Sequence, residues 1–454
     1  MSQAQQLIIS VSGLRGIVGA GLDPYVAIRY AAAFVGGLPA GPIVVTRDGR
    51  GTGQMLAAAV HAGLVGLGRE VLDGDIAATP TTGVLVRQYQ AAGGIQISAS
   101  HNPPEYNGLK LFSAAGRVIS AEAGQAVLNR YQAGEAAWVP HHAVGRMTRI
   151  EDTLAEHQRL VLATVDVARI RKRRFRVLLD SNHGAGSRLG RSLLQQLGCD
   201  VTVVGEPPDG RFAHPAEPTE ENLAGLRTQV TACGADVGFC QDPDADRLAL
   251  IDETGGYVGE EYTLALCLDH VLRQRRGPVV TNCSTSRMSE DLAAASGVPF
   301  FRSAVGEANV TGAMLEHAAV FGGEGNGGPI DPRVGYVRDS FVGMALILDA
   351  LAERDQRLSQ WAEALPRYAM CKTKFTLAPQ RTATVLDALE ARFADARADR
   401  LDGLRLDWPG KWLLVRASNT EPIVRAIAEA PTRDEAERLC AAAGRVIAAG
   451  GADA

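Results

Sequence analysis

Several features that mark membrane, secreted or nucleic-acid-binding proteins are missing from this sequence of 454 residues. No uninterrupted apolar run approaches the ~18 residues of a transmembrane helix, and the opening MSQAQQLIIS lacks the basic and apolar segments of a signal peptide. The net charge of -5 provides no overall field that would attract a polyanion. We therefore expect a cytoplasmic protein that binds neither membranes nor nucleic acid.

Cysteine is sparse, and its seven residues include no pair with C-x-x-C spacing. Neither a zinc site nor a redox motif is therefore indicated, and cysteines in apolar runs such as 237–240 are expected to be buried free thiols. A Walker A sequence is also missing, which argues against a nucleoside-triphosphate kinase. The one basic run, residues 169–176, predicts a solvated helix end that leads into a strand.

Short apolar runs followed by polar clusters and helix-like stretches recur along the chain. The runs at 43–45, 177–179 and 279–281 precede predicted helices at 55–67, 188–197 and 286–295. This alternation predicts an α/β protein with parallel sheets. Ligand-binding loops of such sheets lie at the carboxyl ends of the strands, which is where the polar clusters fall.

Breaks in these patterns predict four domains. The irregular segment 134–147 and the break at 365–368 are the clearest boundaries, and a third is placed near Asp252. Beyond 366 the pattern changes to helix, three short strands and a final helix, which favours an α+β domain with an antiparallel sheet. The predicted domains are α/β domains at 1–148, 149–252 and 253–365, and an α+β domain at 366–454.

A strand at 95–97 runs into the polar turn Ser98-Ala99-Ser100-His101-Asn102-Pro103. Asn-Pro ends regular structure, so Ser100 and His101 are expected to be exposed at the end of the strand. Lys110 lies beyond Gly108 and is able to return toward the same loop. Serines in turns are usually structural, and this segment alone does not establish a catalytic role.

Three carboxylates alternate in Asp242-Pro243-Asp244-Ala245-Asp246-Arg247. This spacing does not suit one helix face, but a loop can wrap all three around one hard cation. A solvated turn is the simplest alternative. An EF-hand is rejected because Arg247 stands where that loop needs glycine. A haloacid-dehalogenase-type phosphatase, with Asp242 as nucleophile, is a rival that Asp246-Arg247 disfavours.

Two further polar stretches follow apolar runs and suit a sugar phosphate. In the Gly-rich loop 322–328, Glu324 and Asn326 are able to bind hydroxyl groups, although a flexible connection would look similar. At 416–422, Arg416 leaves a strand before several polar residues, and Arg425 lies on the next strand. Guanidinium groups and hydroxyls suit a phosphate dianion, and a surface salt-bridge cluster is the alternative. The polar residues in this stretch are Ser418, Asn419 and Thr420.

Taken together, these stretches resemble the α-D-phosphohexomutase family over nearly the whole chain. Residues 12–16 resemble the family's opening loop, 98–103 its phosphoserine loop, 242–247 its metal loop, 323–328 its sugar loop, and 416–422 its phosphate clamp. Their order along the chain is specific to that family. The resemblance implies four domains around a central cleft, three α/β and a C-terminal α+β domain.

The resemblance also implies an isomerase that interconverts hexose 6-phosphate and hexose 1-phosphate. Phosphoserine at Ser100 and the three aspartates would bind Mg²⁺, with a sugar 1,6-bisphosphate as activator. Catalytic roles fall to Ser100, His101, Lys110, Arg15 and Arg247, without a general base being assigned. Substrate binding falls to Glu324, Asn326, Glu307, Arg416, Ser418, Asn419, Thr420 and Arg425. The expected partner is a hexose phosphate, and the protein is expected to be a monomer or homodimer.

Two positions depart from the family's bacterial pattern. Gly328 stands where many bacterial members have histidine, and Glu307 stands where bacterial phosphomannomutases have histidine. Glu307 and the form Gly-Glu-Gly-Asn-Gly-Gly resemble phosphoglucosamine mutases, and we expect Glu307 to favour an ammonium group on the sugar. Phosphomannomutase or phosphoglucomutase activity is the alternative, and a Mg-dependent sugar phosphatase or a silent sugar-phosphate-binding protein are alternatives of other classes.

Overall fold

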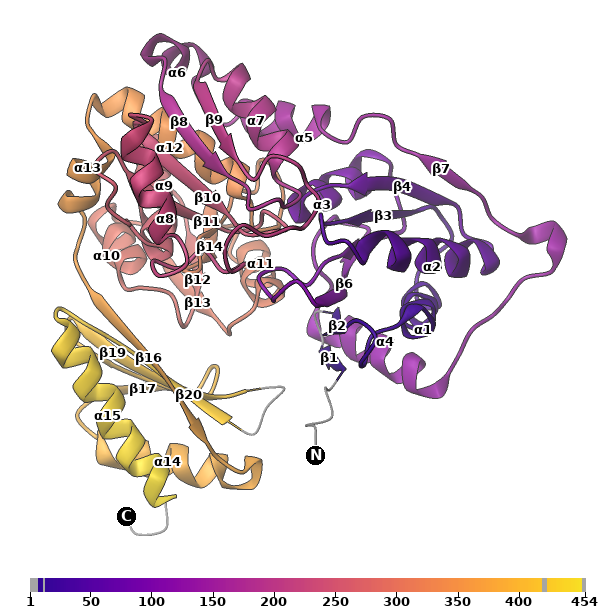
Figure 1. Cartoon of the computed structure of the whole chain (residues 1–454). Helices are drawn as coiled ribbons and strands as arrows, with labels where there is room; N and C mark the ends of the chain where they lie inside the picture. Colours follow the sequence, from indigo (N-terminus) through magenta and orange to yellow (C-terminus); the bar gives the residue numbers. More distant parts are fainter. Residues whose placement is uncertain (1–6, 11–12, 419–422, 451–454) are drawn as a thin grey trace. The chain divides into compact units, whose positions relative to one another are not determined.

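The computed structural model describes residues 7–10, 13–418 and 423–450. The chain forms two compact units, which are described separately: Met1–Val271 with Asn326–Ala362, and Leu272–Gly325 with Glu363–Ala454. We call them the first unit and the second unit. Their helices and strands are labelled in Figure 1.

The first unit begins with a mixed sheet in the strand order β1-β2-β6-β5-β3-β4-β7. Strands β5, β3, β4 and β7 pair in parallel, whereas β1, β2 and β6 are added in antiparallel fashion. The strands are β1 (Ile8–Ser10), β2 (Gly13–Ile17), β3 (Ile43–Arg47), β4 (Val71–Ile76), β5 (Gly93–Ile97), β6 (Tyr106–Ser113) and β7 (Met147–Arg149). The helices are α1 (Pro24–Val35), α2 (Gly53–Gly66), α3 (Thr79–Gln88), α4 (Ala121–Ala133) and the 3-10 helix η1 (His141–Ala143).

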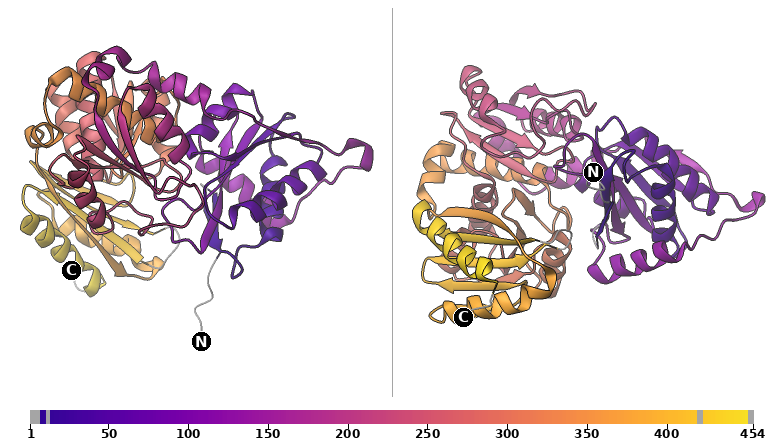
Figure 2. Two further views of the ribbon diagram at one scale, coloured as in Figure 1. Left: turned by 45° about the horizontal axis from the view of Figure 1, so that its top comes forward. Right: turned by 60° about the horizontal axis from the view of Figure 1, so that its bottom comes forward.

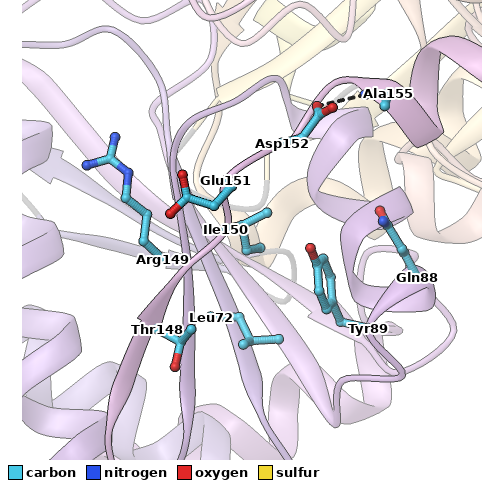
Figure 3. Close-up of a pocket in the computed structure, with 9 residues that line it drawn as sticks. All are labelled: Leu72, Gln88, Tyr89, Thr148, Arg149, Ile150, Glu151, Asp152 and Ala155. Atoms are coloured by element: carbon cyan, nitrogen blue, oxygen red, sulfur yellow. Dashed lines mark hydrogen bonds between the residues drawn. The ribbon is translucent and has the colours of Figure 1, made fainter.

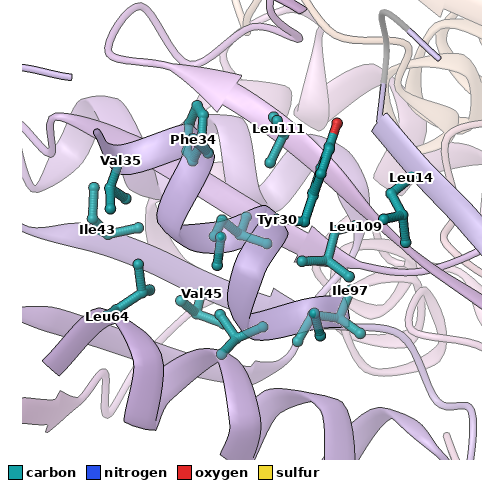
Figure 4. Close-up of a cluster of buried hydrophobic side chains, with 14 of the residues drawn as sticks. Leu14, Tyr30, Phe34, Val35, Ile43, Val45, Leu64, Ile97, Leu109 and Leu111 are labelled. Atoms are coloured by element: carbon teal, nitrogen blue, oxygen red, sulfur yellow. The ribbon is translucent and has the colours of Figure 1, made fainter. Parts of the chain in front are cut away.

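Helices cover both faces of this sheet, and the alternation of side chains along β3 shows why. Ile43 and Val45 pack with Leu64 of α2 in the larger core cluster, which Figure 4 shows. Val44 points to the opposite face and packs with Leu85 of α3. Successive side chains of a strand point to opposite faces. The apolar run 43–45 within β3 therefore suits a strand that is buried on both sides.

The second sheet of the first unit has the order β11-β10-β8-β9. Strands β8, β9 and β10 are parallel, whereas β10 and β11 form an antiparallel hairpin in which Gln241 pairs with Leu248. The turn of this hairpin is therefore residues 242–247, the acidic segment. The elements are α5 (Ala155–Leu162), α6 (Val167–Arg173), β8 (Arg176–Asp180), α7 (Ser187–Gln196), β9 (Asp200–Val204), α8 (Ala224–Ala232), β10 (Val237–Gln241) and β11 (Leu248–Asp252).

The first unit is completed by segments further along the chain. Helix α12 is almost wholly buried, and Asp339 caps its N-terminus by accepting hydrogen bonds from the N–H groups of Phe341 and Val342. The remaining elements are α9 (Glu260–Gln274), which begins in the first unit, β15 (Gly328–Ile330), α12 (Ser340–Arg354) and α13 (Leu358–Ala364).

The second unit contains a parallel group in which β12 lies between β13 and β14, and an antiparallel sheet in the order β16-β20-β19-β18-β17. Helices α14 and α15 cover one face of the antiparallel sheet, as Figure 2 shows. The first group comprises β12 (Val279–Asn282), α10 (Met288–Ala295), β13 (Phe300–Ser303), α11 (Glu307–Glu316) and β14 (Phe321–Glu324). The second comprises β16 (Ala369–Thr376), η2 (Pro379–Arg381), α14 (Thr382–Arg392), β17 (Arg397–Asp399), β18 (Leu404–Trp408), β19 (Lys411–Ala417), β20 (Ile423–Ala430) and α15 (Arg433–Ala449).

The structure corrects one expectation about the sheets and confirms others. Antiparallel strands β6 and β11 make two of the predicted parallel sheets mixed, because each returns from its neighbour through a tight loop that carries polar residues. The basic run does end a helix, α6, before a strand, β8. All seven cysteines are free thiols, and five of them are buried. Among the described residues, no helix is both long and apolar enough to cross a membrane.

Candidate active site

Ser100 lies in the loop between β5 and β6 with a backbone φ of 50°, in the sparsely populated left-handed region. Its side chain is buried, and its Oγ donates a hydrogen bond to Asp242 Oδ2 at 3.0 Å. The imidazole Nδ1 of His101 lies 3.3 Å from the same oxygen. The expectation that Ser100 is exposed is wrong, because the acidic turn lies against it. A strained, buried hydroxyl between a carboxylate and an imidazole is typical of a reactive group rather than of a solvated turn.

The acidic turn brings the three predicted metal ligands together. One oxygen from each of Asp242, Asp244 and Asp246 lies within 4.8 Å of the others, and all three residues are fully buried. The turn is shaped by Asp242 Oδ1, which accepts hydrogen bonds from the N–H groups of Asp246 and Arg247, both at 3.1 Å. Ala245 has a positive φ of 57°, which allows the chain to reverse between β10 and β11.

In Asp244 and Asp246, hydrogen-bond donors bind one of the two carboxylate oxygens, Oδ2. Asp244 Oδ2 accepts hydrogen bonds from Thr79 Oγ1 at 2.5 Å and from Lys110 Nζ at 3.1 Å. Asp246 Oδ2 accepts from Lys110 Nζ at 3.0 Å and from Arg338 Nη2 at 2.7 Å. The Oδ1 atoms of Asp244 and Asp246 are buried and have no hydrogen-bond partner in the described part of the chain. Two buried carboxylate oxygens without donors, beside Asp242, fit a hard divalent cation such as Mg²⁺.

The electrostatics of the turn follow from these contacts. Burial, with Asp244 and Asp246 nearby, raises the pKa of Asp242 well above its usual value. Burial also opposes ionisation of the other two, but Lys110 beside Asp244 and Arg338 beside Asp246 outweigh it and lower the pKa of each carboxyl. Of the three carboxyls, Asp242 is therefore the one whose protonated form the turn favours, because adjacent buried carboxylates oppose one another's ionisation. A divalent cation is able to replace that proton.

Two arginines lie near His101, the residue after Ser100. Arg15 Nη1 donates a hydrogen bond to Asn102 Oδ1 at 3.1 Å, and Arg247 Nη1 lies 3.5 Å from Glu217 Oε1. Arg247, burial and Arg15, in that order, lower the pKa of His101 well below its usual value. The imidazole is therefore neutral near pH 7. A neutral base among fixed guanidinium groups favours a bound dianion at Ser100.

Arg50 is a residue of this site that the sequence analysis missed. Its guanidinium donates hydrogen bonds to four backbone carbonyls of the Ser100 loop, at distances of 2.6 to 3.1 Å. The acceptors are Ser100, Asn102, Pro103 and Tyr106. Asp48 holds Arg50 in place by accepting from its Nε at 3.0 Å and also accepts from Ser98 Oγ at 2.7 Å. The signal was an acid and an arginine directly after β3, at the carboxyl end of a parallel strand.

In the second unit the structure connects the predicted sugar-binding residues through Glu324. Its Oε1 accepts hydrogen bonds from Asn282 Nδ2 at 2.7 Å and from the Gly306 N–H at 3.1 Å. The next residue, Gly325, donates its N–H to Thr285 Oγ1 at 3.0 Å. Glu307 follows Gly306 and begins α11, where the helix dipole favours a carboxylate. Asn326 belongs to the first unit.

The predicted phosphate clamp contains two guanidinium groups on facing positions. Arg416 of β19 pairs with Arg425 of β20, and Lys374 of β16 pairs with Arg425 on its other side. Like charges directly opposite one another on a sheet repel, so this row of three cations favours a bound anion. Asp402 compensates part of the charge by accepting from Arg416 Nε at 3.0 Å. Ser418 lies beside the row, whereas Asn419 and Thr420 lie outside the described residues.

A separate hollow in the first unit contains none of the predicted site residues. It is lined by residues of β4, α3 and the segment around β7, including Leu72, Tyr89, Arg149 and Asp152, which Figure 3 shows. Its charged lining residues, Arg149, Glu151 and Asp152, do not point toward one common position. We assign it no role in the chemistry described below.

Comparison with protein families matches all four parts of the chain to phosphoglucomutase/phosphomannomutase. Three alpha/beta/alpha domains, I, II and III, match residues 6–138, 155–256 and 260–368, and the C-terminal domain matches residues 373–444. The matches follow the order of the predicted domains, whose exact boundaries stay a prediction.

Similar sequences and structures carry related names. A phosphoglucomutase/phosphomannomutase of Thermococcus kodakarensis is 38% identical over 93% of this chain and 94% of its own. A probable phosphoglucosamine mutase of Thermococcus gammatolerans is 32% identical over 96% and 97%. A Burkholderia thailandensis protein of the phosphoglucomutase/phosphomannomutase family has a TM-score of 0.85 at 25% identity, over 98% and 99%. N-acetylphosphoglucosamine mutase of Aspergillus fumigatus, in complex with GlcNAc-6P and magnesium, shares the fold, with a TM-score of 0.60 at 15% identity over 98% of this chain and 96% of that chain.

Replacing Arg50 by methionine tests its role as the support of the Ser100 loop. Arg50→Met removes donors to four carbonyls and leaves Asp48 as an uncompensated buried charge, so we expect a loss of about 3–5 kcal/mol in unfolding free energy. Hydrogen exchange of residues 98–106 should also accelerate. Arg149→Met, which removes an exposed arginine of the same unit, should change stability by less than about 0.5 kcal/mol. Equal stability of the two variants would contradict this role.

Proposed function

Because the chain belongs to the phosphoglucomutase/phosphomannomutase family, we propose that it interconverts hexose 6-phosphate and hexose 1-phosphate through phosphoserine at Ser100. The observation that carries the proposal is the position of Ser100. Its Oγ lies 3.0 Å from Asp242 in a turn whose other carboxylates present oxygens without donors. The reaction is an isomerisation by phosphoryl transfer, and the relatives named above are mutases.

The residues around Ser100 suit the transfer of a phosphoryl group. A sugar hydroxyl attacks the phosphorus atom, the bond from phosphorus to Ser100 Oγ breaks, and a bisphosphorylated sugar forms. Ser100 Oγ gains a proton and the attacking hydroxyl loses one, and the neutral His101 is placed to exchange a proton with Oγ. Arg15 and Arg247 provide fixed positive charge for the equatorial oxygens of the phosphoryl group.

Asp242, Asp244 and Asp246, with an oxygen of the phosphate on Ser100, would hold Mg²⁺. Such a cation neutralises charge on the phosphoryl oxygens as the group moves. The fit rests on the two orphaned Oδ1 atoms and on the closeness of the three carboxylates. Lys110 and Arg338 hold the opposite oxygens of Asp244 and Asp246, which leaves the free oxygens to one ligand.

The second phosphate of the sugar needs a site that accepts it in both orientations of the intermediate. Arg416, Arg425 and Ser418 would hold this phosphate, with Asn419 and Thr420, as the sequence predicts. The facing arginines support this assignment because an anion between them removes their repulsion. Glu324 would bind ring hydroxyls. After the intermediate turns around, its other phosphate returns to Ser100 and the isomer is released.

A Mg-dependent phosphatase built on Asp242 has less support. Asp242 Oδ1 is occupied by two backbone N–H groups and Oδ2 by the Ser100 hydroxyl. Attack by Asp242 on phosphorus would first have to displace the intact Ser100 hydroxyl from Oδ2 and would leave Ser100 without a role, whereas phosphorylation of Ser100 itself removes that donor and opens Oδ2 to a cation. The hydroxyl of Ser100 occupies the corresponding position.

Removing the Ser100 hydroxyl tests the proposal. With Mg²⁺ and a trace of glucose 1,6-bisphosphate, ³¹P NMR should show conversion of a hexose 6-phosphate into the 1-phosphate by the wild type. Ser100→Ala should lower the rate by roughly 10⁴-fold or more, because the group that carries the phosphoryl is lost. The control is Ser113→Ala, whose hydroxyl bonds only the Arg117 carbonyl among the contacts seen. Inorganic phosphate released equally by all three proteins would instead indicate a phosphatase.

Glu307 provides a test of sugar preference. We propose that its carboxylate lies near the 2-position of the sugar and favours the ammonium group of glucosamine phosphate, because the neighbouring Gly306 is tied to Glu324. Glu307→Gln keeps the size and removes the charge, so kcat/KM for glucosamine phosphate should fall about tenfold relative to that for glucose phosphate. An unchanged ratio of the two kcat/KM values would refute this role.

A further inference from the structure

Arg338 lies against the third carboxylate of the acidic turn, although it is 92 residues away in the sequence. Its Nη2 donates a hydrogen bond to Asp246 Oδ2 at 2.7 Å, and the side chain is almost completely buried. Lys110 Nζ reaches the same oxygen at 3.0 Å. Two cations therefore bind one oxygen of Asp246, and the other oxygen, Oδ1, is buried without a hydrogen-bond partner in the described part of the chain.

The two residues that follow Arg338 are fixed by several hydrogen bonds. The N–H of Asp339 donates to the Pro329 carbonyl at 2.8 Å, and the Asp339 carboxylate caps α12 and binds His157 Nε2 at 2.8 Å. Ser340 Oγ then donates to the Ala245 carbonyl, within the acidic turn, at 2.7 Å. The start of α12 is thus bonded to the turn itself, and Arg338 has little freedom to shift as a whole.

Gly328 is packed directly against the stem of Arg338. A Cβ at position 328 would lie 2.4 Å from Cδ, 2.8 Å from Cγ and 3.0 Å from Cβ of Arg338. Gly328 does not have a positive φ, so its conformation is open to other residues, in contrast to Gly327 with a φ of 79°. The requirement for glycine at 328 is therefore one of space. Those atoms are the stem of the arginine and not its mobile end, so an added methyl group would force a different rotamer.

We propose that Arg338 is a positioning residue of the cation site, which orients Asp246, and that position 328 is glycine because Arg338 occupies the space of its side chain. The inference rests on the cation site of the proposed function. Arg338 acts through Asp246, the carboxylate to which it donates a hydrogen bond. This packing explains why glycine stands at position 328, where many bacterial family members have histidine. A larger residue at 328 and Arg338 in this rotamer would occupy the same space.

Gly328→Ala separates the position of the arginine from its charge. The variant keeps the guanidinium but displaces it from Asp246. We expect the dissociation constant for Mn²⁺, used as the probe and measured by electron paramagnetic resonance on the full chain without phosphate on Ser100, to rise by about 10- to 100-fold. In an Arg338→Ala background there is no stem to displace, and Gly328→Ala should then change that constant by less than about twofold.

Matched controls exclude a general effect of added methyl groups or lost arginines. Gly225→Ala adds a methyl group in open space on α8 of the same unit, and Arg333→Met removes an arginine from the loop before α12 that pairs with Asp331. Both should keep the Mn²⁺ affinity of the wild type. The melting temperature of each variant shows whether it is folded, and unchanged Mn²⁺ affinity of Gly328→Ala would overturn the proposal even if Arg338→Ala does not fold.

The outcomes discriminate clearly. Unchanged Mn²⁺ affinity of Gly328→Ala, or equal weakening in both backgrounds, would overturn the proposal, since the effect would then not pass through Arg338. If Gly328→Ala weakens Mn²⁺ binding in the wild-type background but not in the Arg338→Ala background, the proposal is supported. Because Mn²⁺ binding is read without turnover, a protein that behaved in this way yet failed to isomerise hexose phosphates would refute the proposed function and leave the role of Arg338 intact.

Discussion

Asp242, Asp244 and Asp246 are buried together in one turn, and their mutual repulsion is the constraint around which the first unit is arranged. Away from water, charges at this distance interact far more strongly than on a surface. The protein stabilises the turn with Lys110 and Arg338, and the burial of Asp242 beside two other carboxylates raises its pKa. What remains is a shortage of positive charge at the two unpartnered oxygens, which a divalent cation is able to supply.

The compensating groups arrive from separate parts of the fold. Lys110 comes from β6, Thr79 from the start of α3 and Arg338 from the residue before the cap of α12. Lys110 lies within β6, Thr79 at the start of α3 and Arg338 just before α12, and the bodies of these elements are buried. The core therefore sets the positions of these groups, and not the loops alone. Ser100 is placed in the same way, because Arg50 gathers the carbonyl groups of its loop and Asp48 holds Arg50. Loss of packing in the core of the first unit should therefore disturb the acidic turn and the Ser100 loop, even where the lost contact is far from them.

Much of the site could be predicted from the sequence because its motifs are local. The carboxylates of the acidic turn alternate within five residues, and Ser100 stands directly after an apolar strand, so short spacing and strand ends were sufficient. Arg338 and Thr79 could not be found in this way, since their partners are distant in the chain and nothing near them marks a site. The burial of Ser100 was missed for the same reason, because the residues that lie against it belong to another sheet. Arg50 was overlooked although its acidic partner, Asp48, stands two residues before it, directly after β3.

The fold shows the same division between local and long-range information. The strand–helix alternation predicted α/β domains and an α+β end, and the four family matches confirm that architecture. The antiparallel direction of β6 and β11 was not predicted, because a short apolar run has the same pattern in either direction. The proposed sugar preference rests on a single group, Glu307, and the pattern of apolar residues contains no information about it.

The central claim is that the phosphoryl group passes through Ser100, and the most direct measurement follows that group in a single turnover. Protein labelled by radioactive glucose 1,6-bisphosphate would be mixed with unlabelled hexose 6-phosphate and quenched within milliseconds to seconds. The account predicts label on the Ser100 peptide that moves into a sugar bisphosphate at the rate of turnover. Label on an aspartate of the acidic turn, or its direct release as inorganic phosphate, would contradict the account.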